Sequence, residues 1–184
     1  MKTVYVMALL AILFASISAA YSMWSETLQI NNNIETGKVA VSFDSYTCRD
    51  EGPDPQMNSN FNNDEGKDVG ACSIEVQEVD SDGNKVVLQV DVSNAYPGYL
   101  ACIDFTVANT GTIPVKLYNY DLTGVNSTAL NVTFTVPDVT QIHAGESSDT
   151  YTLCIGINQE ADEDASYSFQ LELTFAQWNE VSGP

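Results

Sequence analysis

Hydrophobic and polar residues alternate along most of the chain beyond residue 38, and this alternation predicts short β-strands. In VAVSF at 39–43 and LNVTFTV at 130–136, every second residue is apolar, as in a strand with one buried face. No segment after residue 20 has a helical period of useful length. About eight short strands at regular spacing predict an all-β fold, a two-sheet β-sandwich of jelly-roll or immunoglobulin-like type. The other predicted strands lie at 73–79, 85–92, 101–108, 113–122, 150–157 and 166–178.

The segment at 80–84 predicts a tight hairpin turn, because Asp-Gly between alternating apolar runs is a strong turn signal. The spacing of Asp80, Asp82 and Asn84 also matches half of a calcium-binding loop. An EF-hand needs a Gly after the third ligand and a Glu at its twelfth position, and the residues from Lys85 onward supply neither. We therefore interpret the segment as a turn.

Residues 1–20 have the pattern of a secretory signal peptide, with a basic Lys2, an apolar run and a small-x-small ending. We expect cleavage after Ala20 or, as a second choice, after Ser22. The alternatives are a retained membrane anchor and a pilin-like assembly helix, but the apolar run is shorter than the roughly 20 residues a spanning helix needs. The expected organisation is a signal peptide at 1–20, an arm at 21–33 and a β-sandwich domain at 34–184.

The arm at 21–33, YSMWSETLQINNN, alternates as an extended strand would. Its thirteen residues could span about 40 Å, enough to leave the parent domain and pair elsewhere. It is either a strand given to a neighbouring molecule or the first edge strand of its own sheet, and periodicity by itself favours the second. One face carries Trp24, Glu26, Leu28 and Ile30, and the other carries Met23, Ser25, Thr27 and Gln29.

The charge is strongly acidic, with 6 Lys and Arg against 25 Asp and Glu and a net charge of −19. This excludes nucleic acid as a partner, because binding it requires a basic face, and it disfavours an anionic membrane surface. So large a charge also resists unspecific association. Any specific assembly must overcome the repulsion through burial or backbone pairing.

Four cysteines in an exported chain predict two disulfides. Three pairings are open. We favour Cys48–Cys72, which would close the base of a long polar loop, and Cys102–Cys154, which would join two strands. The loop is an insertion at 49–71, rich in Asp, Asn, Gly and Pro; it is either a contact or bundling loop or a solvated insertion.

Sequons at Asn126 and Asn131 make both candidates for N-glycosylation, with Asn126 preferred because it lies in a predicted loop.

Enzymatic chemistry is not expected. The chain has no HExxH motif, and its single histidine, His143, cannot build a two-histidine zinc site. All four cysteines have a structural use, so no Cys-His or Ser-His-Asp constellation is predicted. We expect no metal, no cofactor and no catalytic residues.

Several stretches together resemble a known family of secreted filament proteins. They are AAYSMWSETLQINNNIETGKVAVSF, YPGYLACIDFTVANTGTIPVKL, HAGESSDTYTLCIGI and ASYSFQLELTFAQWN. The pattern is similar to the TasA/camelysin-like proteins and most similar to the archaeal bundling pilins related to them. The resemblance covers most of the chain after the leader. The acidic insertion and the cysteines depart from the bacterial members, so lateral contacts are not transferred to them.

The resemblance implies a jelly-roll-like sandwich whose N-terminal segment completes the open sheet of the next subunit. The arm would then be the donor strand, with Met23, Trp24, Leu28 and Ile30 as its functional residues. The implied function is a structural subunit of an extracellular, cell-surface filament that supports bundling, adhesion or biofilm. Its partner would be itself, head to tail, with lateral contacts between filaments. The alternative is a monomeric secreted adhesion module that binds glycans or metal.

Overall fold

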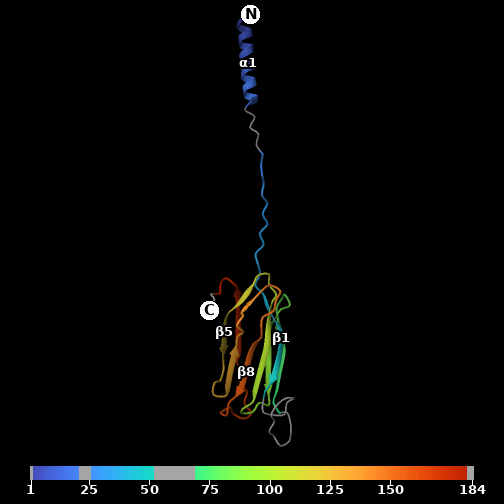
Figure 1. The fold of residues 1–184 in the computed structure, drawn as a ribbon, viewed down its shortest axis with the longest axis vertical. Helices are drawn as coiled ribbons and strands as arrows, with labels where there is room; N and C mark the ends of the chain where they lie inside the picture. Colours follow the sequence, from blue (N-terminus) through green and yellow to red (C-terminus); the bar gives the residue numbers. More distant parts are fainter. Residues whose placement is uncertain (1, 21–25, 52–68, 182–184) are drawn as a thin grey trace. The chain divides into compact units, whose positions relative to one another are not determined.

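The computed structural model describes residues 2–20, 26–51 and 69–181, and it divides the chain into two units at 1–35 and 36–184 (Figure 1). The first unit contains helix α1 (Lys2–Ala20), followed from residue 26 by a segment without helix or strand. Within the described residues, no helix is long and apolar enough to cross a membrane. The positions of Met23 and Trp24 lie outside the described residues.

The second unit is built from antiparallel strands, which confirms the all-β sandwich class. The strands have the alternating burial that the sequence predicted. In the described part of the chain they are β1 (Val41–Asp50), β2 (Ala71–Val79), β3 (Lys85–Ser93), β4 (Leu100–Asn109), β5 (Val115–Thr123), β6 (Leu130–Thr135), β7 (Gln141–Ile142), β8 (Tyr151–Ile157) and β9 (Gln170–Gln177).

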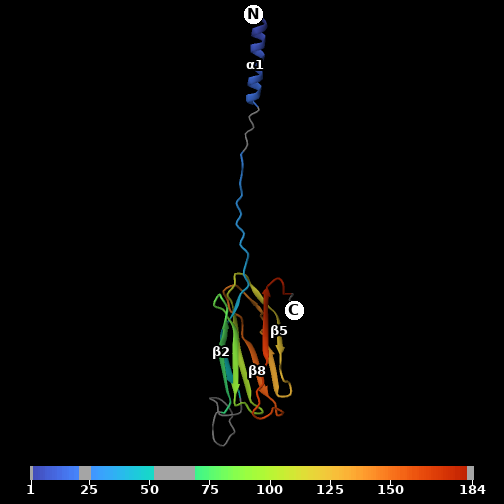
Figure 2. The same cartoon turned by 180° about the vertical axis from the view of Figure 1, so that it is seen from behind.

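The strands form one continuous layer and one divided layer. The continuous sheet has the order β1-β4-β8-β6. The divided layer consists of the hairpin β2-β3 and a three-stranded sheet of order β7-β5-β9. In Figure 2 the hairpin lies toward one side of the unit and β5 toward the other, with β8 of the continuous sheet visible between them. Side chains from all three sheets join a single hydrophobic core.

The core is centred on the two middle strands of the continuous sheet. On β4, Ile103, Phe105 and Val107 are buried, and Tyr151, Leu153 and Ile155 on β8 face the same core. The ring of Phe105 stacks on that of Tyr151 with 5.4 Å between centroids. Burying a large apolar side chain contributes about 1.5–3 kcal/mol, so these two strands contribute much of the stability of the unit.

The structure contains two disulfides in the described residues, with the pairing that the sequence analysis favoured; one links two sheets and the other lies within one sheet. Cys48 on β1 is bonded to Cys72 on β2, so the continuous sheet is linked covalently to the hairpin. Cys102 and Cys154 are bonded directly across the ladder between β4 and β8. Cross-links of this kind restrict the unfolded chain and stabilise a small domain by about 2–4 kcal/mol each.

Several predicted boundaries were wrong. Strand β1 begins at Val41, because the main chain before it bonds to a turn instead of entering a ladder, and Val39 is exposed. The loop predicted at 49–71 is shorter at both ends, since β1 continues to Asp50 and β2 begins at Ala71; residues 52–68 within it lie outside the described part. The last strand begins only at Gln170. Strand β7 was missed, because two residues carry no periodicity.

Candidate assembly site

The described part of the arm, residues 26–33, belongs to no strand in this structure. Its apolar side chains are exposed to solvent: the exposed fraction is 90% for Leu28 and 83% for Ile30, and Ile34 follows with 85%. Exposed apolar residues at every second position are the feature expected of a strand that has not met its partner.

Residues 36–40 lead from the arm into β1 and belong to the second, all-β unit, which we call the β unit. We call these residues the arm base, and hydrogen bonds hold them to the turn between β4 and β5. The amide of Lys38 donates to the Thr112 hydroxyl at 2.8 Å, and the amide of Thr112 donates back to the Lys38 carbonyl at 2.9 Å. The Ala40 carbonyl accepts from the amides of Thr110 and Gly111 at 3.0 and 3.1 Å. The chain thus enters the sandwich between residue 38 and residue 40 along the turn that joins β4 to β5.

Asn109 organises this turn. It ends β4, and its side chain is buried with only 1% exposed. Its side-chain amide donates to the carbonyl oxygens of Ile113 and Ile142 at 2.9 and 3.0 Å, and its side-chain oxygen accepts from the amide of Gly111 at 2.9 Å. One buried side chain therefore holds the end of β4, the following turn and the end of β7 together.

Two glycines allow the arm base to approach the turn closely. A Cβ atom on Gly111 would lie 2.3 Å from the carbonyl oxygen of Lys38 and 2.8 Å from the amide nitrogen of Ala40. A Cβ atom on Gly37 would lie 2.3 Å from a methyl carbon of Ile113. All three distances are well below van der Waals contact. Glycine is required at position 111 in particular, because the obstructing atoms there are main-chain atoms.

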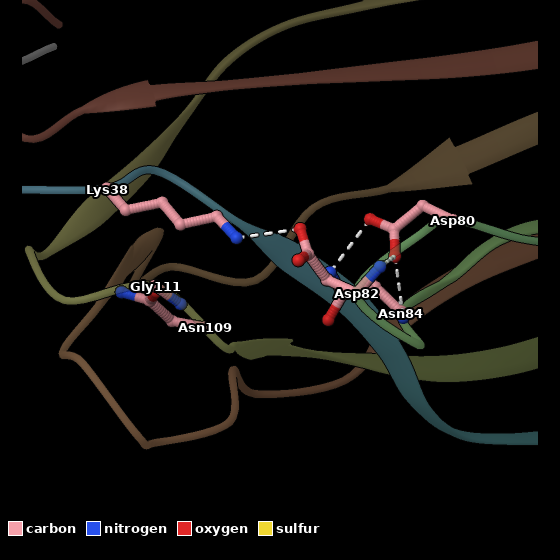
Figure 3. Close-up of polar contacts among 6 residues, drawn as sticks. All are labelled: Lys38, Asp80, Asp82, Asn84, Asn109 and Gly111. Carbon is pink, nitrogen blue, oxygen red and sulfur yellow. Dashed lines mark hydrogen bonds and ion pairs between the residues drawn. The ribbon is translucent and has the colours of Figure 1, made fainter.

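An ion pair ties the arm base to the hairpin. Figure 3 shows the Lys38 ammonium pointing to the Asp82 carboxylate, and Nζ lies 2.7 Å from Oδ2. The hydrogen bond with Asp82 raises the pKa of Lys38 above its ordinary value. Both side chains are about half exposed, so solvent screens the pair and it adds little stability. The pair joins residue 38 to the tip of the hairpin β2-β3.

The hairpin tip is the predicted turn, closed by one carboxylate. Asp80 accepts hydrogen bonds from the amides of Asp82 and Asn84, both at 2.9 Å, and from the side-chain amide of Asn84 at 2.8 Å (Figure 3). Gly83 has φ of 89°, the left-handed conformation that glycine adopts at no steric cost. The side-chain bond from Asn84 lowers the pKa of Asp80. Among the described residues there is no cluster of three possible metal ligands, here or elsewhere.

The core is best covered at its centre and less well covered at its edges and under the divided layer. The inward-facing side chains of β4 and β8 are buried, but those of β2, β3 and β9 are only half-buried, as are most of those of the edge strands β1 and β6. In the described part of the chain, β9 pairs only with β5, and β2 and β3 pair only with each other. The half-buried core residues on these three strands include Ile74, Val90, Val92, Leu171, Leu173 and Phe175.

Tyr151 places a polar atom in the centre of this core. Its side chain is fully buried among Phe105, Phe134 and Phe175, and its hydroxyl has no hydrogen-bond partner among the described residues. Burial raises the pKa of Tyr151 to about 12. The hydroxyl is therefore neutral, and it keeps unused capacity to donate and to accept a hydrogen bond.

The remaining predicted site residues lie apart from the arm base. His143 is exposed in the turn after β7, where its carbonyl accepts from the amide of Glu146. Asn126 is exposed in a loop, and its side-chain oxygen caps the amide of Thr128 at 3.1 Å. Asn131 is exposed on β6.

Sequence reasoning missed the most organised part of the site. Asn109 and Gly111 lie in an Asn-Thr-Gly sequence that predicts an ordinary turn, so nothing marked Asn109 as a buried residue.

Comparisons of the chain with protein-family models, with curated proteins and with solved structures found no match.

Proposed function

We propose that this protein is the structural subunit of an extracellular filament, in which the arm of one copy completes the divided layer of the next. The observation that carries the proposal is that one chain contains both an arm with exposed apolar residues and a β-sandwich with a divided layer. The TasA-like resemblance of the sequence points to the same mechanism. The two disulfides and the leader pattern support an extracellular location.

The arm has the chemistry of an added strand. An extended segment carries unpaired N–H and C=O groups, and the unpaired edge of a sheet is a template for them. Residues 21–33 contain a single charged residue, Glu26, in a chain of net charge −19. Entry of this segment into a neighbouring subunit therefore meets less repulsion than entry of any acidic surface would.

The acceptor in this proposal is the interruption between the hairpin β2-β3 and strand β9. A strand added there would pair with free edges and lay Leu28 and Ile30 on the half-buried core residues of both sides. Burial of each of these side chains would contribute about 1.5–3 kcal/mol.

The test compares two double substitutions in the full-length exported protein. Leu28→Asp with Ile30→Asp places two charges on the apolar face of the arm, and Thr27→Asp with Gln29→Asp places the same charges on the polar face. We expect the wild type and the second variant to form long filaments by negative-stain electron microscopy, and the first variant to remain as dispersed subunits. Equal filament lengths for both variants, or dispersed wild-type particles, would refute the proposal.

A further inference from the structure

The two glycosylation sequons lie in different surroundings, and the fold accounts for the asparagine of the first. The side-chain oxygen of Asn126 accepts hydrogen bonds from the amides of Thr128 and Ala129 at 3.1 and 3.3 Å, so it closes the turn before β6. The side-chain amide of Asn158 holds the same turn, because it donates to the Thr128 carbonyl at 3.0 Å. Asparagine is favoured in such turns because its side chain caps main-chain amides. The asparagine at 126 therefore has a structural explanation.

Asn131 has no such role in the fold. It lies inside strand β6, where asparagine is disfavoured, and its side chain makes no hydrogen bond within the described part of the chain. It alternates with the core residues Leu130 and Val132, so it stands on the outer face of the sheet. Thr133, the hydroxyl residue of the same sequon, is exposed on this face too. Both functional side chains of the second sequon are thus accessible from solvent.

The sheet surface beside Asn131 is open. Gly156 on β8 is the direct cross-strand neighbour of Asn131, and it pairs with Leu100 of β4 on its other side. A Cβ atom on Gly156 would make only ordinary contacts, the nearest at 3.5 Å, and its φ is not positive. Neither packing nor main-chain conformation therefore requires glycine here. Glycine inside a strand often marks a place where another group approaches closely.

Leu100 borders this open surface. It is half-buried and alternates with the core residues of β4, so it lies on the outer face. One of its methyl carbons would be 3.8 Å from a Cβ atom on Gly156. One face of a pyranose ring carries mainly C–H groups, so a sugar placed over Gly156 would bury apolar surface against Leu100.

We propose that Asn131, and not Asn126, carries an N-linked glycan whose first sugar lies over Gly156 and Leu100. The donor is a sugar whose anomeric carbon C1 is bonded to a lipid-borne phosphate. In the transfer a bond forms between Asn131 Nδ2 and C1, and the C1–O bond breaks with its electron pair leaving on the phosphate. Nδ2 loses one proton to a base of the transferase. The Thr133 hydroxyl completes the sequon that the transferase recognises.

The test is peptide mass spectrometry of the full-length protein purified from the cells that produce it, with fragmentation that keeps sugars attached. We expect a glycan on Asn131 in most copies and on Asn126 in few or none. Thr133→Ala should abolish the glycan, and Thr133→Ser should retain it because serine keeps the hydroxyl. Thr128→Ala is the matched control, because it removes the other sequon but keeps the amide that bonds to Asn126. It should leave the glycan mass unchanged.

Three results would overturn the site: an unmodified Asn131 in the wild type, a glycan confined to Asn126, or a glycan that persists in Thr133→Ala. Both substituted threonines are exposed, so every variant should keep the far-UV circular dichroism of the wild type. The inference rests on the extracellular location proposed above and not on the filament. Because the measured quantity is the mass of a peptide, failure to form filaments would leave this result unaffected.

A second measurement tests where the first sugar lies. Asn131→Gln should lower the melting temperature of the glycosylated protein, because the contacts over Gly156 and Leu100 are lost with the glycan. In a Gly156→Val background a side chain already fills this space, so the same substitution should lower the melting temperature by less. Equal decreases in the two backgrounds, or no decrease in either, would overturn the position given to the sugar.

Discussion

The side-chain amide of Asn109 donates a 3.0 Å hydrogen bond to the main-chain carbonyl of Ile142, although 33 residues separate them in sequence. Both residues are buried, so this carbonyl is removed from water. The same side chain also bonds to Ile113 and Gly111. The position at which the arm enters the β unit therefore depends on a polar network inside the fold, because the turn that this network holds is the one that bonds to residues 38–40.

Replacing Asn109 by Ala should destabilise the β unit strongly. The substitution removes the side-chain amide that donates to the buried Ile142 carbonyl, and loss of a hydrogen bond at a buried polar group costs about 1–3 kcal/mol. Urea unfolding followed by tryptophan fluorescence should show a clearly lower midpoint. The matched control is Asn119→Ala, because Asn119 is exposed on β5. The free energy of unfolding of this variant should differ from that of the wild type by less than about 0.5 kcal/mol. Similar midpoints for the two variants would contradict the role given to Asn109.

Gly111→Ala should be tolerated much less well than Gly156→Ala. A Cβ at position 111 would meet the main chain of residues 38–40 at 2.3 Å, whereas at position 156 its nearest contact is an ordinary 3.5 Å. We expect the first variant to release the arm base, seen as faster hydrogen exchange at the amides of Lys38 and Thr112. The second variant should retain the exchange rates of the wild type, and equal rates in both variants would exclude the close approach as a constraint.

The Arg49–Asp104 pair predicts how stability depends on pH. The hydrogen bond from Arg49, supported by Thr152, lowers the pKa of Asp104 below its ordinary value. A group whose pKa is lower in the folded state stabilises the fold above its unfolded pKa, about 3.9 for Asp, and this contribution is lost as pH falls through the folded pKa. Asp104→Asn should therefore lower the free energy of unfolding, measured by urea titration, by about 1 kcal/mol at pH 7. The difference from the wild type should become progressively smaller below about pH 4.

The control for this pH dependence is Asp121→Asn. Asp121 faces Glu172 across the ladder, so removal of its charge relieves a like-charge contact. Its unfolding free energy at pH 7 should stay equal to that of the wild type or rise slightly. An Asp104→Asn cost that persisted unchanged into acid would show that packing, and not the carboxylate, accounts for the effect.

The sequence predicted the strands that bury a continuous apolar face and missed what depends on contacts between distant segments. Alternation along β4 and β8 predicted two core strands, and the Asp-Gly turn predicted the hairpin. Nothing local distinguishes the buried Asn109 from a turn asparagine, because its partners come from other segments. Val39 continues the alternation of β1 but lies outside the strand, because main-chain bonds to a turn replace the ladder there. The sequence also could not predict that Leu28 is exposed and lies outside any strand; the structure was needed to show this.

Amide hydrogen exchange of residues 26–33, measured in assembled filaments and in unassembled subunits separated by sedimentation, tests the central claim most directly. In isolated subunits these amides lie outside any strand and should exchange rapidly. If the arm completes the divided layer of a neighbour, alternate amides should become protected in filaments, together with amides on the free edges of β9 and the hairpin. Rapid exchange of the arm in assembled filaments would contradict the account.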